Sequence, residues 1–316
     1  MIVAITGGSG FIGRQLVARH CARGDQVRYL TRQSSAGHIA GATAFPGDLT
    51  ASVEQLRNFA SGADILYHCA AELRIEARMR STNILGTANL IAAMRGDVGR
   101  WVQLSSTGVY GRNVHGDVHE DTVVRPANTY EISKVAADNI LREAAEQQNI
   151  SCVVVRPSNV YGEFMPNQSL FQLMKIIDRG LFFFIGKPGA VANYVHVENV
   201  VDALLLCATA KLPGNGRTYI VSDHRTVEAL VQTIATALKK QSPALRLPAA
   251  MVRTICVLAG GIPGFPLSLS RVDALTSRTV YRTKRIEDEL GYRNRISMET
   301  GMYNLARQWK MLTTGT

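Results

Sequence analysis

The sequence predicts an α/β fold, with helices on both faces of a doubly wound parallel sheet. Short apolar runs alternate with segments of helical periodicity over the first 160 residues, and the links between them are short. Parallel strands need a crossover between them, and a helix is the usual crossover. The composition agrees, because 46% of the 316 residues are hydrophobic and 19% are charged, as in ordinary globular domains.

The expected elements begin with a strand, a turn and a helix. Residues 2–5 are an apolar run that ends in Thr6-Gly7-Gly8, and residues 11–21 follow with apolar side chains at helical spacing. This order then repeats along the chain. The other expected strands are residues 27–30, 42–46, 64–69, 100–104 and 151–155, and the other expected helices are residues 53–60, 81–94 and 130–147.

The turn after the first strand is rich in glycine. Gly7, Gly10 and Gly13 have the spacing Gly-x-x-Gly-x-x-Gly. The first glycine allows a tight turn, the second lets the backbone approach a pyrophosphate, and the third lets the helix pack against the strand. The N-terminus of the helix adds free N–H groups and a favourable dipole. The motif therefore predicts a Rossmann domain that binds a dinucleotide.

The end of the second strand distinguishes NAD from NADP. An acidic side chain at this point binds the ribose hydroxyls of NAD, but this chain has Thr31 and Arg32. A guanidinium suits a 2′-phosphate, so we expect NADP or NAD, with NADP favoured by Arg32. Asp48 follows the third strand and is a candidate for the adenine amine, although an Asp at such a place also serves as a turn or helix-capping residue.

The alternation of strands and helices fades after about residue 160, where glycine and proline become frequent. We therefore expect residues 1–160 to form the NAD(P)-binding Rossmann domain. Residues 161–316 are expected to form mainly a smaller substrate-binding portion, interleaved with the last strands of the sheet. We expect a small-molecule substrate, and the pattern leaves a homodimer open.

Charge and cysteine content narrow the class of protein. The net charge is +10, with dispersed Lys and Arg, which indicates a basic surface or an anionic substrate rather than a nucleic-acid partner. The five cysteines are scattered without a CxxC pair, so we expect reduced thiols, no metal site and a cytoplasmic protein. No apolar stretch reaches the length of a transmembrane helix.

Three side chains have the pattern of a hydride-transfer site. Tyr130 and Lys134 lie four residues apart at the start of an expected helix, so they share a face. A nearby ammonium is expected to lower the pKa of the phenol. Segment 104–111, which contains Ser105 and Ser106, ends the fifth strand, at the sheet edge where ligands bind in such folds. A hydroxyl there can hold a substrate oxygen while the phenol exchanges its proton.

These motifs together resemble those of the extended short-chain dehydrogenase/reductases, also called the NAD-dependent epimerase/dehydratase family. The resemblance covers nearly the whole chain. The segments that carry it are residues 6–13, 47–49, 67–71, 83–89, 105–111, 130–134, 156–162, 194–200 and 289–292.

The resemblance implies roles for individual residues. Ser106 matches the catalytic hydroxyl, Tyr130 the proton donor and Lys134 its partner. Substrate contacts are implied at Ser106, Thr107 and Asn159. The implied cofactor-binding residues are Gly7, Gly10, Phe11, Ile12, Gly13, Thr31, Arg32, Asp48, Leu49, Ala70, Ala71, Asn83, Tyr130, Lys134, Pro157 and His196.

The chain also departs from the family pattern. Thr107 and Gly108 stand where the sugar dehydratases carry an Asp-Glu pair, so we do not expect dehydration. An arginine that often helps to hold a diphosphate is replaced within Ala192-Asn193. We expect Arg271 or Arg278 to take its place, because the planar guanidinium binds phosphate oxygens in pairs.

Three functions compete. The leading hypothesis is an oxidoreductase acting at the 4-position of a nucleotide sugar, as a 4-epimerase or a 4-ketosugar reductase. The alternative is an NADP-dependent reductase or dehydrogenase of a hydrophobic ketone or alcohol, resembling the dihydroflavonol reductases and 3β-hydroxysteroid dehydrogenases. Arg32, residues 181–185, whose aromatic side chains would suit an apolar pocket, and the apolar stretch 247–266 favour this alternative. A non-enzymatic NADP(H) sensor is disfavoured by the intact Ser106, Tyr130 and Lys134.

Overall fold

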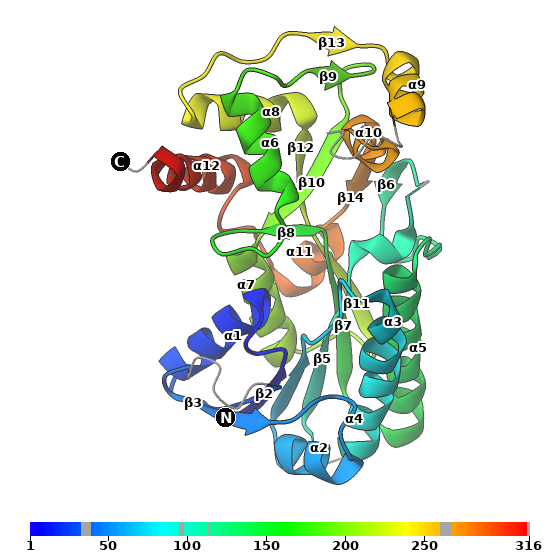
Figure 1. Cartoon of the computed structure of the whole chain (residues 1–316). Helices are drawn as coiled ribbons and strands as arrows, with labels where there is room; N and C mark the ends of the chain where they lie inside the picture. Colours follow the sequence, from blue (N-terminus) through cyan, green and yellow to red (C-terminus); the bar gives the residue numbers. More distant parts are fainter. Residues whose placement is uncertain (33–38, 95–97, 113, 260–266, 315–316) are drawn as a thin grey trace.

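The computed structural model describes residues 1–32, 39–94, 98–112, 114–259 and 267–314. Its main sheet has seven strands in the order β11-β7-β5-β4-β1-β2-β3, and all neighbouring strands are parallel (Figure 1). This confirms the doubly wound α/β fold. The strands are β1 (Ile2–Thr6), β2 (Gln26–Thr31), β3 (Ala42–Pro46), β4 (Ile65–His68), β5 (Arg100–Leu104), β7 (Cys152–Pro157) and β11 (Arg217–Val221).

Two layers of helices cover the sheet, because successive side chains of a strand point to opposite faces. In β1, Val3 and Ile5 belong to one buried cluster and Ala4 to the other. The first cluster includes apolar side chains of α1 (Phe11–Ala22) and α7 (Val197–Thr209). The second includes those of α2 (Val53–Ala60), α4 (Gly86–Met94) and α5 (Thr129–Gln148).

A smaller part of the molecule is built on the three-stranded sheet β12-β10-β8, at the upper end of Figure 1. Its core lies between that sheet and the helices α6, α8 and α12. The elements are β8 (Asn159–Tyr161), β10 (Val191–His196), β12 (Asp223–Thr226), α6 (Ser169–Asp178), α8 (Val227–Ala237) and α12 (Met298–Thr314).

Short elements complete the described chain. Two parallel strand pairs, β9 with β13 and β6 with β14, lie outside the larger sheets. The elements are α3 (Glu76–Met79), β6 (Gly116–Val118), β9 (Phe184–Ile185), β13 (Arg246–Leu247), α9 (Ala249–Ala259), α10 (Leu269–Thr276), β14 (Thr279–Tyr281) and α11 (Lys284–Leu290).

The two parts of the molecule are interleaved. β11 comes from the second half of the sequence, yet it pairs with β7 along the edge of the seven-stranded sheet, with Tyr219 opposite Val155. Ile286 of α11 and Tyr292 join the core beneath this sheet. A division of roles between residues 1–160 and 161–316 stays a prediction.

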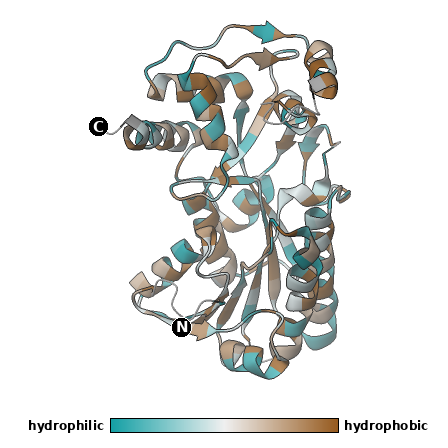
Figure 2. Cartoon of the chain, viewed as in Figure 1, coloured by the Kyte–Doolittle hydropathy of each residue, from teal (hydrophilic) through white to brown (hydrophobic). Residues whose placement is uncertain are grey.

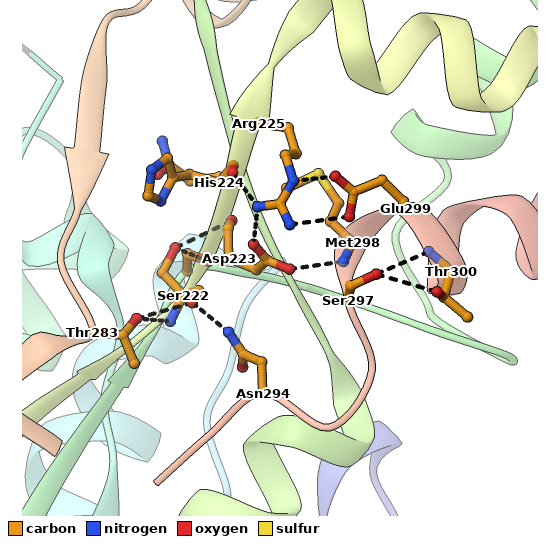
Figure 3. Close-up of polar contacts among 12 residues, drawn as sticks. Ser222, Asp223, His224, Arg225, Thr283, Asn294, Ser297, Met298, Glu299 and Thr300 are labelled. Carbon is orange, nitrogen blue, oxygen red and sulfur yellow. Dashed lines mark hydrogen bonds and ion pairs between the residues drawn. The ribbon is translucent and has the colours of Figure 1, made fainter. Parts of the chain in front are cut away.

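A network of polar contacts joins the C-terminal helix to β12 (Figure 3). The Asp223 carboxylate accepts the N–H of Met298 at 2.7 Å, at the start of α12, where the helix dipole favours an anion. Arg225 forms ion pairs with both Asp223 and Glu299. Asn294 donates to the backbone oxygen of Ser222 at 3.0 Å. These contacts hold the chain where it passes from the large sheet to the small one.

Two regions differ from the expected pattern. The predicted helix 81–94 is not a plain α-helix, because residues 80–85 form a π-helical turn that leads into α4. Phe182 and Phe184 do not line an apolar pocket as expected. Their rings pack edge to face at 5.2 Å inside the core of the smaller part. Residues 260–266 of the apolar stretch 247–266 lie outside the described residues. Within the described part of the chain, no helix is both long and apolar enough to cross a membrane.

Candidate functional site

A cavity of about 1480 Å³ lies at the carboxyl ends of β1, β2, β4, β5 and β7, at the edge where open parallel sheets bind ligands. The strand order reverses between β1 and β4, and this opens a crevice there. Most of the site residues expected from the sequence line this cavity. They are Gly7, Gly10, Phe11, Ile12, Gly13, Thr31, Arg32, Asp48, Leu49, Ala70, Ala71, Ser106, Tyr130, Lys134, Pro157 and Asn159.

The glycine turn forms one wall of the cavity and has no room for side chains. Gly7 has a φ of 68°, and a Cβ there would lie 2.7 Å from the backbone nitrogen of Ala70. A Cβ on Gly13 would lie 2.1 Å from the carbonyl oxygen of Gly7. α1 starts without a side-chain cap at Gly10, so its first-turn N–H groups face the cavity without an intrahelical partner. This cradle fits a pyrophosphate.

The end of β2 forms a second wall. Arg32 is largely exposed there, with its Nε 3.9 Å from the Asp48 carboxylate. The Asp48 carboxylate also accepts the backbone N–H and the hydroxyl of Thr50, each at 2.8 Å. Asp48 therefore acts as a turn residue, whether or not it also meets a nucleotide.

Three catalytic candidates meet in the cavity wall. α5 begins at an Asn128 cap, whose side chain accepts the N–H of Glu131 at 2.9 Å, and this puts Tyr130 in the first turn. The Tyr130 phenol lies close to the Ser106 hydroxyl in this wall. The Gly108 N–H donates to the Ser106 oxygen at 3.0 Å and holds it in position. A carbonyl oxygen placed between the two hydroxyls would receive hydrogen bonds from both.

The lysine has a different partner from the one the sequence suggested. The Lys134 ammonium is buried and donates to the carbonyl oxygen of Leu104 at 2.5 Å. The expected lowering of the Tyr130 pKa is wrong for this structure. Burial raises the pKa of Tyr130 to about 12, and the nearby Ser106 hydroxyl offsets burial only in part. Burial lowers the pKa of Lys134 itself, and the nearby Asp138 carboxylate acts in the opposite direction.

A buried ion pair lies directly beneath these groups. Asp138, one turn after Lys134 on α5, accepts the Ser105 hydroxyl at 2.8 Å and the Arg156 guanidinium at 3.1 Å. Arg156 also donates to the Tyr110 hydroxyl at 3.0 Å. All of these side chains are buried, so the network fixes α5 against β5 and β7. This network was not predicted from the sequence. The one signal for it was that Asp138 follows Lys134 by four residues, which places both on one face of the helix.

Asn83 supports the site from behind its wall and does not line the cavity. Its side-chain amide accepts the N–H of Glu72 at 2.7 Å and donates to the Glu72 carbonyl at 3.1 Å and to the Ser133 hydroxyl at 2.9 Å. The Glu72 carboxylate in turn accepts the N–H groups of the next three residues, which lowers its pKa. Asn83 thus fixes the position of residues 69–74, the segment after β4 that lines the cavity.

Four other predicted residues also lie outside the cavity lining. Thr107 is buried and lies close to the Tyr281 phenol. The ring of His196 packs edge to face on Tyr161, with centroids 5.3 Å apart, and accepts the N–H of Glu198 as a helix cap. Arg271 donates to Gln172, and Arg278 donates to the carbonyl oxygen of Pro188 at 2.6 Å. Their predicted contacts with cofactor or substrate gain no support from these positions.

The rim of the cavity contains residues that no sequence motif marked. Leu73 is exposed, and Phe164 is 87% exposed with a φ of 61°. This conformation is uncommon for a residue other than glycine. The guanidinium of Arg74 reaches the Pro166 carbonyl at 3.4 Å, so the two rim segments touch. An isolated exposed phenylalanine and leucine carry no recognisable spacing, which is why the sequence did not identify them.

Comparison with known proteins decides the family. The model described as the NAD dependent epimerase/dehydratase family matches residues 3–222. The chain belongs to this family. It is therefore an NAD(P)-dependent enzyme of the extended short-chain dehydrogenase/reductase type, as the motifs implied.

Family members of different activity resemble this chain. The Stigmatella aurantiaca 4-hydroxy-2-methyl-3-oxo-4-farnesyl-3,4-dihydroquinoline-1-oxide ketoreductase is 32% identical over 238 residues, covering 71% of this chain and 69% of that protein. A 3-beta-hydroxysteroid dehydrogenase from Mycolicibacterium neoaurum is 27% identical over 274 residues, covering 79% and 74%. The structure of the Thermotoga maritima UDP-glucose 4-epimerase with UDP-glucose has a TM-score of 0.75 at 22% identity, covering 99% and 100% of the two chains. At 22% sequence identity, this similarity shows that the two proteins share a fold.

Proposed function

We propose that this family member interconverts a ketone and a secondary alcohol on a substrate with a large apolar body, using NADP(H) or NAD(H). One observation carries the proposal. The Ser106–Tyr130 pair shares its cavity with exposed apolar residues at the rim, Leu73 and Phe164, while Arg271 and Arg278 lie outside the cavity lining. The diphosphate contacts that a nucleotide sugar would need therefore have no support at the two predicted arginines.

The chemistry divides between cofactor and protein. The nicotinamide supplies the hydride in reduction and accepts it in oxidation. Ser106 holds the carbonyl oxygen, and Tyr130 donates its phenolic proton to that oxygen as the alkoxide forms. A pKa of about 12 keeps Tyr130 protonated at neutral pH, so it is ready to act as the acid in reduction. Lys134, close beneath the site, adds a positive charge that favours negative charge developing there.

The relatives agree with this class of reaction. The names of the ketoreductase and of the hydroxysteroid dehydrogenase both describe exchange between a carbonyl and a hydroxyl group. The first of these relatives acts on a substrate that carries a farnesyl chain. An apolar cavity rim suits such a substrate, because each buried CH₂ group contributes about 0.8 kcal/mol to binding.

A second candidate is an enzyme acting at the 4-position of a nucleotide sugar, as a 4-epimerase or a 4-ketosugar reductase. The fold shared with the UDP-glucose 4-epimerase favours it. Asn159 lines the same cavity as Ser106, and Arg74 lies at its rim as a cation that can meet a phosphate. Both candidates use the same hydroxyl pair and differ in what the rest of the cavity holds.

Thermal unfolding separates the two candidates. With saturating NADP⁺, we expect a steroid ketone or a long-chain methyl ketone to raise the Tm, and UDP, GDP and dTDP to leave it unchanged. A ligand at 100 times its Kd adds about 2.7 kcal/mol of stability, which is a readily measured shift. Phe164→Ser should weaken the ketone effect, and Val123→Ser, also at an exposed position, is the control. Stabilisation by a nucleoside diphosphate with no response to any ketone would favour the sugar candidate.

Cofactor choice tests the role of Arg32. We expect NADP(H) to bind about tenfold more tightly than NAD(H), the lower end of the range for a charge-assisted bond, because Arg32 is largely exposed. Arg32→Glu should reverse the preference by repelling the 2′-phosphate. Isothermal titration with both cofactors measures this, with Arg293→Glu as a control for an exposed arginine elsewhere. If the wild-type protein prefers NAD(H), Arg32 does not determine the cofactor preference.

A further inference from the structure

Helix α9 exposes apolar side chains at the end of the molecule away from the large sheet (Figure 1). Met251, Ile255, Val257 and Leu258 are all exposed, the last two by 67% and 80%. Scattered apolar residues are normal on a protein surface, but four within eight positions form a patch. Much of this helix has the colour of hydrophobic residues in Figure 2.

The patch is separate from the face that α9 buries. Val252 and Cys256 pack into a small core with Ile185 and Val272. Met251, Ile255 and Leu258 have the spacing i, i+4, i+7, which sets them in one stripe beside that core. No described residue of α9 lines the catalytic cavity. Neither the fold nor the proposed chemistry accounts for this exposed stripe.

The sequence around α9 is strongly basic. Residues 239–282 contain seven Lys and Arg but a single acid, Asp273, and that acid is paired with Arg253 at 2.5 Å. Three more of these cations pair with acids of neighbouring segments. The pairs are Lys240 with Asp178, Arg246 with Glu228, and Arg282 with Asp117.

Positive charge remains beside the patch after these pairings. Lys187 is exposed, and Arg278 is bound by a neutral carbonyl group. Lys187 follows Gly186, whose backbone approaches Ala249 at the start of α9. Two cations that no acid is shown to neutralise, Lys187 and Arg278, therefore lie near the start of α9, although the sequence has no basic run.

We propose that this surface, called here the α9 face, docks on an anionic lipid bilayer, with α9 lying in the interface. An apolar stripe flanked by Lys and Arg is the pattern of helices that lie in the headgroup region, where apolar burial and attraction to anionic lipids add. A second copy of the chain is a poorer occupant, because it would bring like charges together. The proposal goes beyond the oxidoreductase function and does not depend on which substrate the cavity accepts.

Vesicle flotation of the full chain tests the proposal. We expect the protein to float with vesicles of phosphatidylcholine and phosphatidylglycerol in a 7:3 ratio, and to stay in solution with pure phosphatidylcholine. Binding should fall by at least tenfold in 0.5 M salt, because the Debye length shrinks to a few ångströms. Val257→Glu/Leu258→Glu should lower binding to anionic vesicles by at least tenfold.

A matched variant controls for the added negative charge. Val123 and Leu312 are 67% and 79% exposed, close to the values for Val257 and Leu258, and both lie outside α9. Val123→Glu/Leu312→Glu should therefore keep at least half of the vesicle binding. Circular dichroism melts confirm that both variants fold. The proposal fails if the wild type binds no vesicles, or if both variants lose binding equally. It also fails if the α9 variant instead dissociates an oligomer in analytical ultracentrifugation, because the α9 face would then bind a second copy.

Discussion

Tyr130→Phe is expected to lower kcat by about 10²-fold or more and to leave cofactor affinity nearly unchanged. The phenylalanine keeps the ring, but it removes the hydroxyl and with it the proton that Tyr130 donates. The half-buried ring and its helix stay in place, because the Asn128 cap and the Asp138 network fix α5 independently of the phenol. Steady-state kinetics and cofactor titration on the same preparation measure both effects.

A surface tyrosine provides the control. Tyr303 lies on α12, well outside the residues that line the cavity, so Tyr303→Phe should retain wild-type kcat. Near-normal turnover in Tyr130→Phe would mean that another group donates the proton, and the assignment of the site would be wrong. A loss of cofactor affinity without a loss of kcat would likewise contradict the role given to the phenol.

Gly13→Ala should weaken NADP(H) binding by about 10²-fold. The added Cβ would lie 2.1 Å from the Gly7 carbonyl oxygen, which is backbone and cannot rotate away. The turn and α1 must move apart, and the first-turn N–H groups move with them. Losing two charge-assisted hydrogen bonds, at about 1.5 kcal/mol each, corresponds to about 10²-fold in affinity. Titration of the cofactor at equilibrium gives the value directly.

Gly214→Ala is the matched control for this substitution. No heavy atom lies within 4 Å of a Cβ built on Gly214, and its φ is not in the left-handed region. The same methyl group should therefore leave both the Tm and cofactor affinity unchanged. Wild-type affinity in Gly13→Ala would show that the glycine turn does not form the cofactor cradle.

The sheet was predictable because its strands carry their own signal. Strands buried on both faces are apolar throughout, as in Val153-Val154-Val155, and short turns separate them from helices of clear periodicity. The glycine turn was predictable for the same reason, since close backbone approach leaves glycine as the one residue that fits. These features depend on the residues within one short segment, so the sequence of that segment is enough to predict them.

Features that depend on distant partners were not predictable. The sequence cannot show that the Lys134 ammonium binds the Leu104 carbonyl, or that Asp138 meets Arg156 across two elements. Arg278 suited a phosphate by its chemistry, but tertiary packing turned it toward Pro188. The aromatic residues 182–184 suited an apolar pocket equally well, and the fold used Phe182 and Phe184 as core.

The late position of β11 in the sequence affects how the chain is made. β7 ends at Pro157, but its partner β11 is complete only at Val221. At about 5–20 residues per second, the ribosome needs roughly 3–12 s to add the intervening 60 or so residues. During that time the nascent sheet has an open, apolar edge, which can pair with another nascent chain. Pairing of β11 with β7 covers this edge only once the second half of the chain has emerged.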